Sequence, residues 1–207
     1  MKVFIHGCSF AENLDVDWSW PTMLQNNFEV ENFARSANSN QHIFLSVIEN
    51  INKMHPGDTM IVSWGDIVRF YTKNPKDKSN LVETYVEHFH NETLDKEHYS
   101  FYLDRVEQLA KEAGVKLIIL WSSPSDYGPM SLERFLYDHL DVNTARYEKT
   151  FEIDIRPALI FYSLAEIREM NLPKEERINC FAHDERPNHI ASKETHLTIY
   201  NRIVEHL

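Results

Sequence analysis

A serine stands near the N-terminus, at the point where a buried strand is expected to end. The apolar residues 3–5 are followed by His6, Gly7 and Cys8, and Ser9 comes next. A polar side chain just beyond the carboxyl end of a first strand lies where α/β proteins bind their ligands, and a glycine beside it lets other backbone come close. Ser9 is therefore a candidate nucleophile. The alternative is that it is simply a small polar residue in a first turn.

Three further segments follow in an order that is typical of one enzyme family. They are residues 31–40 (ENFARSANSN), 61–69 (IVSWGDIVR) and 184–189 (DERPNH). With these segments and Ser9, the chain resembles the SGNH (GDSL-like) hydrolases. In that family the first block carries the nucleophilic serine, the second a Gly, the third an Asn, and the last an Asp and a His separated by two residues. The resemblance implies that Ser9 is the nucleophile of an ester hydrolase.

Two blocks depart from the family pattern at the residues that would hold the oxyanion. Ala37 stands in the place of the Gly, and residues 64–66, Trp-Gly-Asp, lack the Asn. Oxyanion donors must be fixed in advance, and each is worth roughly a hundredfold or more in rate. The resemblance implies the backbone N–H groups of Ser9 and Ala37 as two donors. Either Asn40 or the Gly65 N–H could replace the missing third.

The last block offers a base and an acid. A serine hydroxyl needs a base within hydrogen-bond reach, and a carboxylate that orients the base improves it. The resemblance implies His189 as the base, because it lies just ahead of the last expected helix, and Asp184 as the acid. The usual place of the acid, three residues before the histidine, holds Arg186. Either Asp184 reaches across a longer loop, or a backbone carbonyl orients the ring. His183 and His196 compete as bases, although a surface or capping role suits His196 better.

Two of the candidate site residues have ordinary structural alternatives. Asn40, like Asn38, could cap the helix that follows it. Arg69 follows the third expected strand, where it could bind a carboxylate or sulfate of the substrate or pair with a surface acid.

Composition narrows the class of protein. The chain has 207 residues, 43% of them hydrophobic, which is enough for one sizeable core. A net charge of -11 disfavours nucleic acid as a partner, because phosphate binding needs clustered Lys and Arg. No apolar run has membrane-spanning length, and no N-terminal segment has the pattern of a signal peptide. We expect a cytoplasmic protein that acts on a small-molecule or carbohydrate ester without contact to a membrane.

The cysteines and histidines do not indicate a metal. Cys8 and Cys180 cannot make a disulfide framework and are expected to be buried thiols. Strand alternation turns Cys8 away from the face that presents Ser9, which disfavours Cys8 as the nucleophile. None of the 11 histidines belongs to a cluster with the spacing of a closed metal site. No metal and no organic cofactor is therefore expected.

Strand and helix patterns alternate along the chain, which favours a parallel sheet with helices on both faces. The resemblance implies the same fold class, a three-layer α/β/α fold with a mostly parallel central sheet (flavodoxin-like). Strands are expected at residues 2–5, 28–32, 60–64 and 115–121, and helices over 20–24, 43–54, 99–113 and 193–207. The buried stripe of the last helix is expected to comprise Leu197, Tyr200, Ile203, Val204 and Leu207.

We expect one domain over residues 1–207 with an insertion around residues 122–179. A helix that opens at Pro157 is expected inside this insertion. The insertion could shape a pocket or a subunit contact, or it could be extra surface structure.

Three functions remain open at this point. The first is a serine esterase in which Ser9 attacks the carbonyl of a short-chain ester, possible substrates including an O-acetylated carbohydrate. The second is a relaxed relative of such enzymes that binds a glycan or a protein partner, which the departures at Ala37, Trp64 and Arg186 would suit. The third is an acyltransferase that uses the same serine and excludes water.

Overall fold

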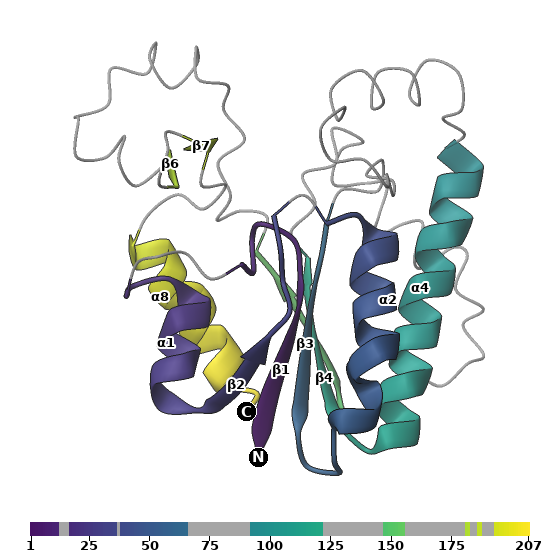
Figure 1. The fold of residues 1–207 in the computed structure, drawn as a ribbon, viewed down its shortest axis with the longest axis horizontal. Helices are drawn as coiled ribbons and strands as arrows, with labels where there is room; N and C mark the ends of the chain where they lie inside the picture. The colour runs from purple at the N-terminus through teal and green to yellow at the C-terminus, as the bar shows by residue number, and fades with distance from the viewer. Residues whose placement is uncertain are drawn as a thin grey trace.

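The computed structural model describes residues 1–12, 17–36, 38–65, 92–121, 147–155, 181–182, 186–187 and 193–207. A five-stranded sheet forms its centre, with strand order β2-β1-β3-β4-β5 and every neighbouring pair parallel (Figure 1). The strands are β1 (Lys2–Gly7), β2 (Glu29–Asn32), β3 (Thr59–Trp64), β4 (Lys116–Trp121) and β5 (Thr150–Asp154). A short antiparallel pair joins β6 (Phe181–Ala182) to β7 (Arg186–Pro187).

Helices cover both faces of the sheet. They are α1 (Trp20–Asn27), α2 (Asn40–Asn50) continued by the 3-10 turn η1 (Ile51–Lys53), α4 (Glu92–Ala113) and α8 (Lys193–Val204). Helices α1 and α8 lie side by side on one face, and α2 and α4 lie on the other (Figure 1). The expected three-layer α/β/α fold is confirmed.

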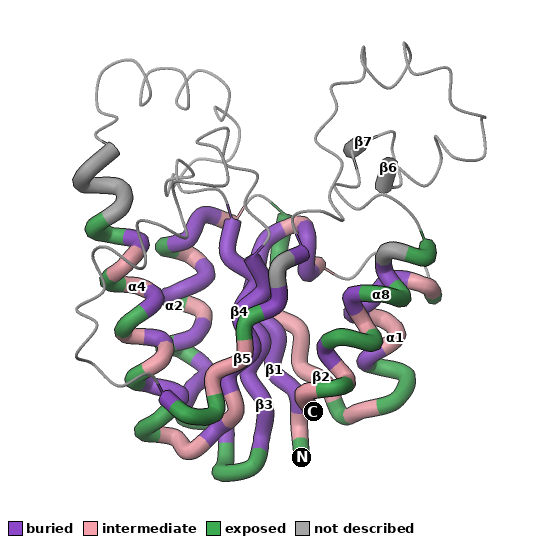
Figure 2. Tube along the Cα trace, turned by 180° about the vertical axis from the view of Figure 1, so that it is seen from behind, coloured by how far each residue is buried: buried purple, intermediate pink, exposed green. Residues whose placement is uncertain are grey.

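The central strands are buried along almost their whole length. Every residue of β3 is buried, as are all residues of β1 and β4 after the first, and Figure 2 shows these strands enclosed between the helices. Parallel strands that are covered on both faces read as continuous apolar runs rather than as alternating patterns. This is why the sequence located β1, β3 and β4 to within one or two residues.

Local signals also set the helix ends. Ser19 caps α1, with Pro21 in the first turn, where a missing N–H costs nothing. Ser39 caps α2, and its hydroxyl accepts from the His42 N–H at 3.3 Å. At the end of α4, Gly114 has a φ of 70°, which suits glycine and ends the helix as expected.

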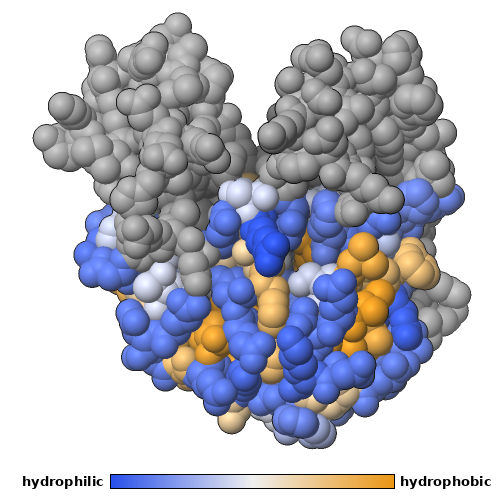
Figure 3. Space-filling model, in the orientation of Figure 1, coloured by the Kyte–Doolittle hydropathy of each residue, from blue (hydrophilic) through white to orange (hydrophobic). Residues whose placement is uncertain are grey.

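The outer surface of α2 and α4 is partly apolar. Figure 3 shows hydrophobic side chains gathered over α2 and beside α4, and the exposed large ones on these helices are Leu45, Ile48 and Phe101. The helical spacing of the apolar residues in 43–54 predicts that Ile43, Val47 and Ile48 all face the core. The prediction is wrong for Ile48, because Ile43 and Val47 take the buried face.

The last helix is also turned differently from the expectation. Leu197 is 47% exposed, whereas His196, Ile199 and Ile203 are buried against the rest of the molecule. The helical spacing of the apolar residues predicts that Leu197 belongs to the buried face of this helix. The hydrogen bond between His196 and the Trp20 N–H turns His196 inward instead.

The segment 122–179, in which an insertion is expected, contributes a strand to the central sheet. Residues 150–154 form β5, which pairs with β4 from Leu117 to Trp121. Glu107 of α4 holds the start of this strand, because its carboxylate accepts from the Tyr147 N–H and from the Thr150 hydroxyl. The helix expected to open at Pro157 lies outside the described residues.

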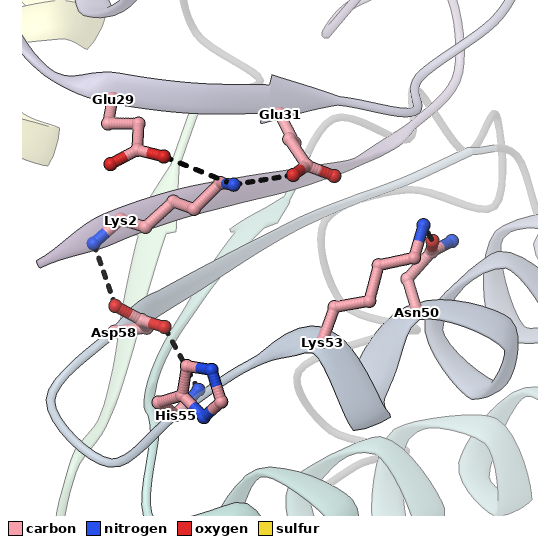
Figure 4. Close-up of polar contacts among 7 residues, drawn as sticks. All are labelled: Lys2, Glu29, Glu31, Asn50, Lys53, His55 and Asp58. Carbon is pink, nitrogen blue, oxygen red and sulfur yellow. Dashed lines mark hydrogen bonds and ion pairs between the residues drawn. The ribbon is translucent and has the colours of Figure 1, made fainter.

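Polar contacts hold the amino edge of the sheet (Figure 4). The Asp58 carboxylate accepts from the Lys2 N–H at 2.8 Å and from the His55 N–H at 2.9 Å, which closes the turn before β3. The Lys2 ammonium pairs with Glu29 and Glu31 of β2, and these carboxylates raise the pKa of Lys2. The first residue of β1 is thereby tied to both neighbouring strands.

The last residue of β1 is in close contact with two other segments. A Cβ built on Gly7 would lie 2.9 Å from Ala11 Cβ and 3.0 Å from Ser63 Cβ. Real Cβ atoms do not approach neighbours so closely, so only glycine fits between the turn after β1 and the end of β3.

We expect Gly7→Ala to lower the free energy of unfolding by about 1–3 kcal/mol, because overpacking a tight core costs that much. Urea unfolding measures the change. A second variant, Gly7→Ala with Ala11→Gly, removes the nearest clash and should recover part of the loss. An unchanged midpoint in the single variant would contradict the close approach.

A buried histidine occupies the last but one position of β1. The His6 ring stacks on Phe33 with centroids 5.2 Å apart, and its Nδ1 is 2.9 Å from the Ser46 hydroxyl. Burial lowers the pKa of His6 to about 3. Its unfolded pKa is about 6.5, so the unfolded chain binds more protons below that pH, and stability falls as the pH falls from about 6.5 towards 3.

The variant His6→Asn keeps a polar group that can donate or accept a hydrogen bond near the Nδ1 position and removes the titration. Between pH 6.5 and 5, where most carboxylates stay ionised, the wild type should lose up to about 1.4 kcal/mol of unfolding free energy per pH unit more than the variant. Urea unfolding at a series of pH values gives both slopes. Parallel slopes would show that His6 is not a buried neutral ring.

Candidate functional site

Ser9 lies in a tight turn directly after β1. The Cys8 carbonyl accepts from the N–H groups of Ala11 and Glu12, at 3.0 and 3.1 Å, which makes a single helical turn. Ser9 is half-buried, and its hydroxyl oxygen is enclosed with no hydrogen-bond partner among the described residues. Buried polar groups are almost always paired, so an unpaired hydroxyl here calls for a reason. A nucleophile that pairs only with its base or substrate is such a reason.

Three side chains from other segments hold the backbone of this turn. The hydrogen bonds are Trp20 Nε1 to the Phe10 carbonyl at 2.9 Å, Asn32 Nδ2 to the Ala11 carbonyl at 2.9 Å, and Asn38 Nδ2 to the Gly7 carbonyl at 3.0 Å. The donors come from α1, from the end of β2 and from the segment that follows β2. The Ser9 turn is therefore fixed from several sides before any ligand binds.

The topology places this turn at the functional edge of the sheet. The chain leaves β1 through α1 on one face and later enters β3 from α2 on the other face (Figure 1). Strands β1 and β3 are neighbours, so the strand order reverses direction between them. Open α/β sheets bind ligands at such a switch point, beyond the carboxyl ends of the strands. Ser9 and Gly65 follow the two strands that flank it.

Asn40 joins α2 to the end of β3. Its side chain is almost fully buried, and it makes two hydrogen bonds to Gly65: the Gly65 N–H donates to Asn40 Oδ1 at 2.8 Å, and Asn40 Nδ2 donates to the Gly65 carbonyl at 3.3 Å. The Gly65 N–H is thus occupied by Asn40. Neither Asn38 nor Asn40 caps α2 through its side chain, since Ser39 does so.

The structure describes only part of the predicted site. Ser9 and Gly65 follow the carboxyl ends of β1 and β3, and Asn40, the first residue of α2, is hydrogen-bonded to Gly65. The remaining predicted residues, Ala37, Arg69, Asp184 and His189, lie outside the described residues, as does the competing His183.

His196, the other competing base, is buried rather than at the surface. Its Nδ1 accepts a hydrogen bond from the Trp20 N–H at 3.1 Å, and its ring meets Trp18 edge-on at 5.1 Å. Burial lowers the pKa of His196 to about 4. The expected surface position of His196 is therefore wrong. Its ring instead accepts one of the first N–H groups of α1, which have no partner within that helix.

Sequence reasoning missed the residues that hold the Ser9 turn. Asn32 and Asn38 belong to the segment 31–40, which contains several asparagines just after an expected strand. Asparagines in such a place often bond to loop backbone, so the sequence did carry a signal for these two contacts. No such signal exists for Trp20, because a Trp before a proline predicts only the start of a helix.

Within the part of the chain that the structure describes, no cluster of three or more His, Cys, Asp or Glu side chains could hold a metal ion. None of the described helices is long and apolar enough to cross a membrane. Cys8 is buried and forms no disulfide within the described part of the chain, as expected.

The parallel sheet of order 2-1-3-4-5 and its two helical layers define a three-layer α/β protein of flavodoxin-like topology, with a serine in the turn after the first strand. No protein-family model and no curated protein matches the chain. Solved structures do. One is a protein from Desulfitobacterium hafniense DCB-2 assigned to the G-D-S-L family of lipolytic proteins, with 15% identity, a TM-score of 0.57, and coverage of 100% of this chain and 99% of that one.

Two other solved structures share the fold. A member of the lipolytic G-D-S-L family from Veillonella parvula DSM 2008 has 13% identity and a TM-score of 0.53, with 99% of this chain and 97% of that one covered. A protein from Bacteroides fragilis NCTC 9343 assigned as an acylhydrolase has 13% identity and a TM-score of 0.55, with 99% and 85% covered. The resemblance found in the sequence is thus confirmed at the level of the fold.

We expect Asn40→Ala to lower the free energy of unfolding by about 1–3 kcal/mol, because it leaves the buried Gly65 N–H and carbonyl without their partner. Chemical denaturation checks the loss. Gln41→Ala, at the next and exposed position of α2, serves as the matched control and should change stability by less than about 0.5 kcal/mol. Equal effects of the two substitutions would argue against the Asn40 contact.

Proposed function

We propose that the protein is a serine ester hydrolase that acts on short-chain esters through Ser9. The observation that carries the proposal is the Ser9 hydroxyl, which is enclosed and unpaired among the described residues, in a turn held by three hydrogen bonds at the switch point of the sheet. The fold is shared with proteins assigned as lipolytic proteins and acylhydrolases, which supports the reaction class.

In the proposed reaction His189 takes the proton of the Ser9 hydroxyl as its oxygen bonds to the ester carbonyl carbon. The tetrahedral intermediate then loses the alcohol, to which His189 returns the proton, and an acyl-enzyme remains. Water, deprotonated by the same histidine, attacks the acyl group and releases the carboxylic acid. We assign Asp184 to orient the histidine ring.

For the oxyanion we propose the backbone N–H groups of Ser9 and Ala37 as donors. The Gly65 N–H donates to Asn40 Oδ1. We therefore propose that Asn40 and Gly65 form a fixed wall of the site and do not supply a third donor to the oxyanion. Arg69 is proposed to bind a carboxylate or sulfate of the substrate. A hole with two firm donors should be less efficient than one with three, since each donor is worth roughly a hundredfold.

The tryptophans give little support for a carbohydrate as the alcohol part of the substrate. Trp20, Trp64 and Trp121 are buried in the core, so they cannot stack on a sugar. Only Trp18 is partly exposed. Short-chain esters are therefore the first substrates to test, with O-acetylated carbohydrates as one class among them.

A second candidate function is a relaxed relative that binds a glycan or a protein partner without turnover. It is favoured by the departures at Ala37, at residues 64–66 and at Arg186, all of which concern transition-state stabilisation or base orientation rather than the fold.

The test is hydrolysis of p-nitrophenyl acetate and butyrate by the wild type, Ser9→Ala and His189→Ala. Both variants should lose about a thousandfold or more in kcat, because nucleophile and base act as a unit. Ser36→Ala replaces an exposed serine in the second recognised block and should leave the rate unchanged. A fluorophosphonate probe should label the wild type at Ser9, as read by mass spectrometry of the labelled peptide.

Full activity or labelling in Ser9→Ala would contradict the assignment of Ser9 as the nucleophile. A wild type that is folded but neither hydrolyses these esters nor reacts with the probe would favour the binding module instead. Screening against a glycan array would then be the next step.

A further inference from the structure

Trp20 makes two buried hydrogen bonds to parts of the chain that are far apart in sequence. Its backbone N–H donates to His196 Nδ1 at 3.1 Å, and its Nε1 donates to the Phe10 carbonyl at 2.9 Å. The residue is completely buried. One side chain and its own backbone thus connect α8 with the turn that carries Ser9.

The His196 end of this connection is well defined. The ring is 1% exposed and lies edge-on to Trp18. Because Nδ1 accepts the Trp20 N–H, the neutral ring must carry its proton on Nε2. A histidine drawn into the core in this way, in place of Leu197 on the expected stripe, sets the rotation of α8 about its own axis.

The Phe10 end acts on the turn itself. The Phe10 carbonyl and the Ala11 N–H belong to the same peptide plane, one residue beyond Ser9. The carbonyl accepts from Trp20 Nε1, and the N–H donates to the Cys8 carbonyl, so this plane is held on both sides. A plane held in this way limits how the backbone of the turn can move, and the position of Ser9 in the turn depends on that backbone.

We propose that Trp20 and His196 form a positioning pair that sets the Ser9 turn relative to helix α8. The chain enters α8 at Lys193, four positions after His189, so the anchoring of α8 bears on where the proposed base can stand. A displacement of about 1 Å between reacting groups can cost about a hundredfold in rate. The kinetic consequence of the pair rests on the proposed function, whereas the mechanical coupling does not.

Two substitutions separate the contact from general packing. His196→Leu removes the acceptor at similar volume, and His196→Asn keeps an oxygen near the Nδ1 position. Trp20→Phe keeps an aromatic ring in the core and the backbone N–H that bonds to His196, and it removes the Nε1 donor together with part of the ring volume. Thr198→Val, on the exposed side of α8, removes a hydrogen bond to Glu194 within the helix and is the matched control.

The first readout is amide hydrogen exchange followed by mass spectrometry, which needs no activity. In His196→Leu and in Trp20→Phe, the amides of Ala11 and Glu12 should exchange about tenfold faster or more, while those of β4 keep their rate. His196→Asn and Thr198→Val should match the wild type. A rise spread equally over β4, or no rise in the Ser9 turn, would overturn the coupling and leave a merely structural contact.

The second readout is ester hydrolysis. The two disruptive variants should lose about tenfold to a hundredfold in kcat with KM within about threefold, and His196→Asn should recover the rate. Unchanged kcat in folded variants would also overturn the positioning role. If the wild type hydrolyses no ester, the proposed function fails, and the exchange rates alone decide the coupling. If His196→Leu does not fold, Trp20→Phe decides it.

Discussion

The structure depends on the close approach of three segments at Gly7, the last residue of β1. Its carbonyl accepts from the Arg35 N–H and from the Asn38 side chain, and its Cα leaves no room for a Cβ beside Ala11 and Ser63. The turn after β1, the segment after β2 and the end of β3 can meet only because this residue has no side chain. The candidate site lies on that meeting point.

Amide side chains provide much of the order around the site. Asn32 and Asn38 bond to the backbone at the end of β1 and in the turn after it, and Asn40 bonds to the backbone of Gly65 after β3. Residues beyond a strand end have lost their ladder partners, and their backbone groups must find others. Asparagine carries both a donor and an acceptor on a short side chain, so it can replace those partners, while the Ser9 hydroxyl has no partner among the described residues.

The histidines illustrate how a shared fold leaves function to individual residues. At 13–15% identity, the solved structures with this fold agree in the course of the backbone and say little about the side chains. His6 and His196 are neutral, buried and structural, since burial lowers the pKa of both. The proposed base, His189, is assigned by its place in the sequence. The proposed nucleophile, Ser9, is supported in addition by the geometry of its turn.

The sequence by itself determined the fold class, the strands β1, β3 and β4, the end of α4 at Gly114 and the position of Ser9, because each depends on neighbouring residues. Only the tertiary structure decided the place of β5, the buried face of α8 and the partners of Asn40. Those depend on contacts between distant residues: Asn40 and Gly65 are 25 positions apart, and Trp20 and His196 are 176 apart. A local pattern carries no information about which distant backbone group a polar side chain will reach.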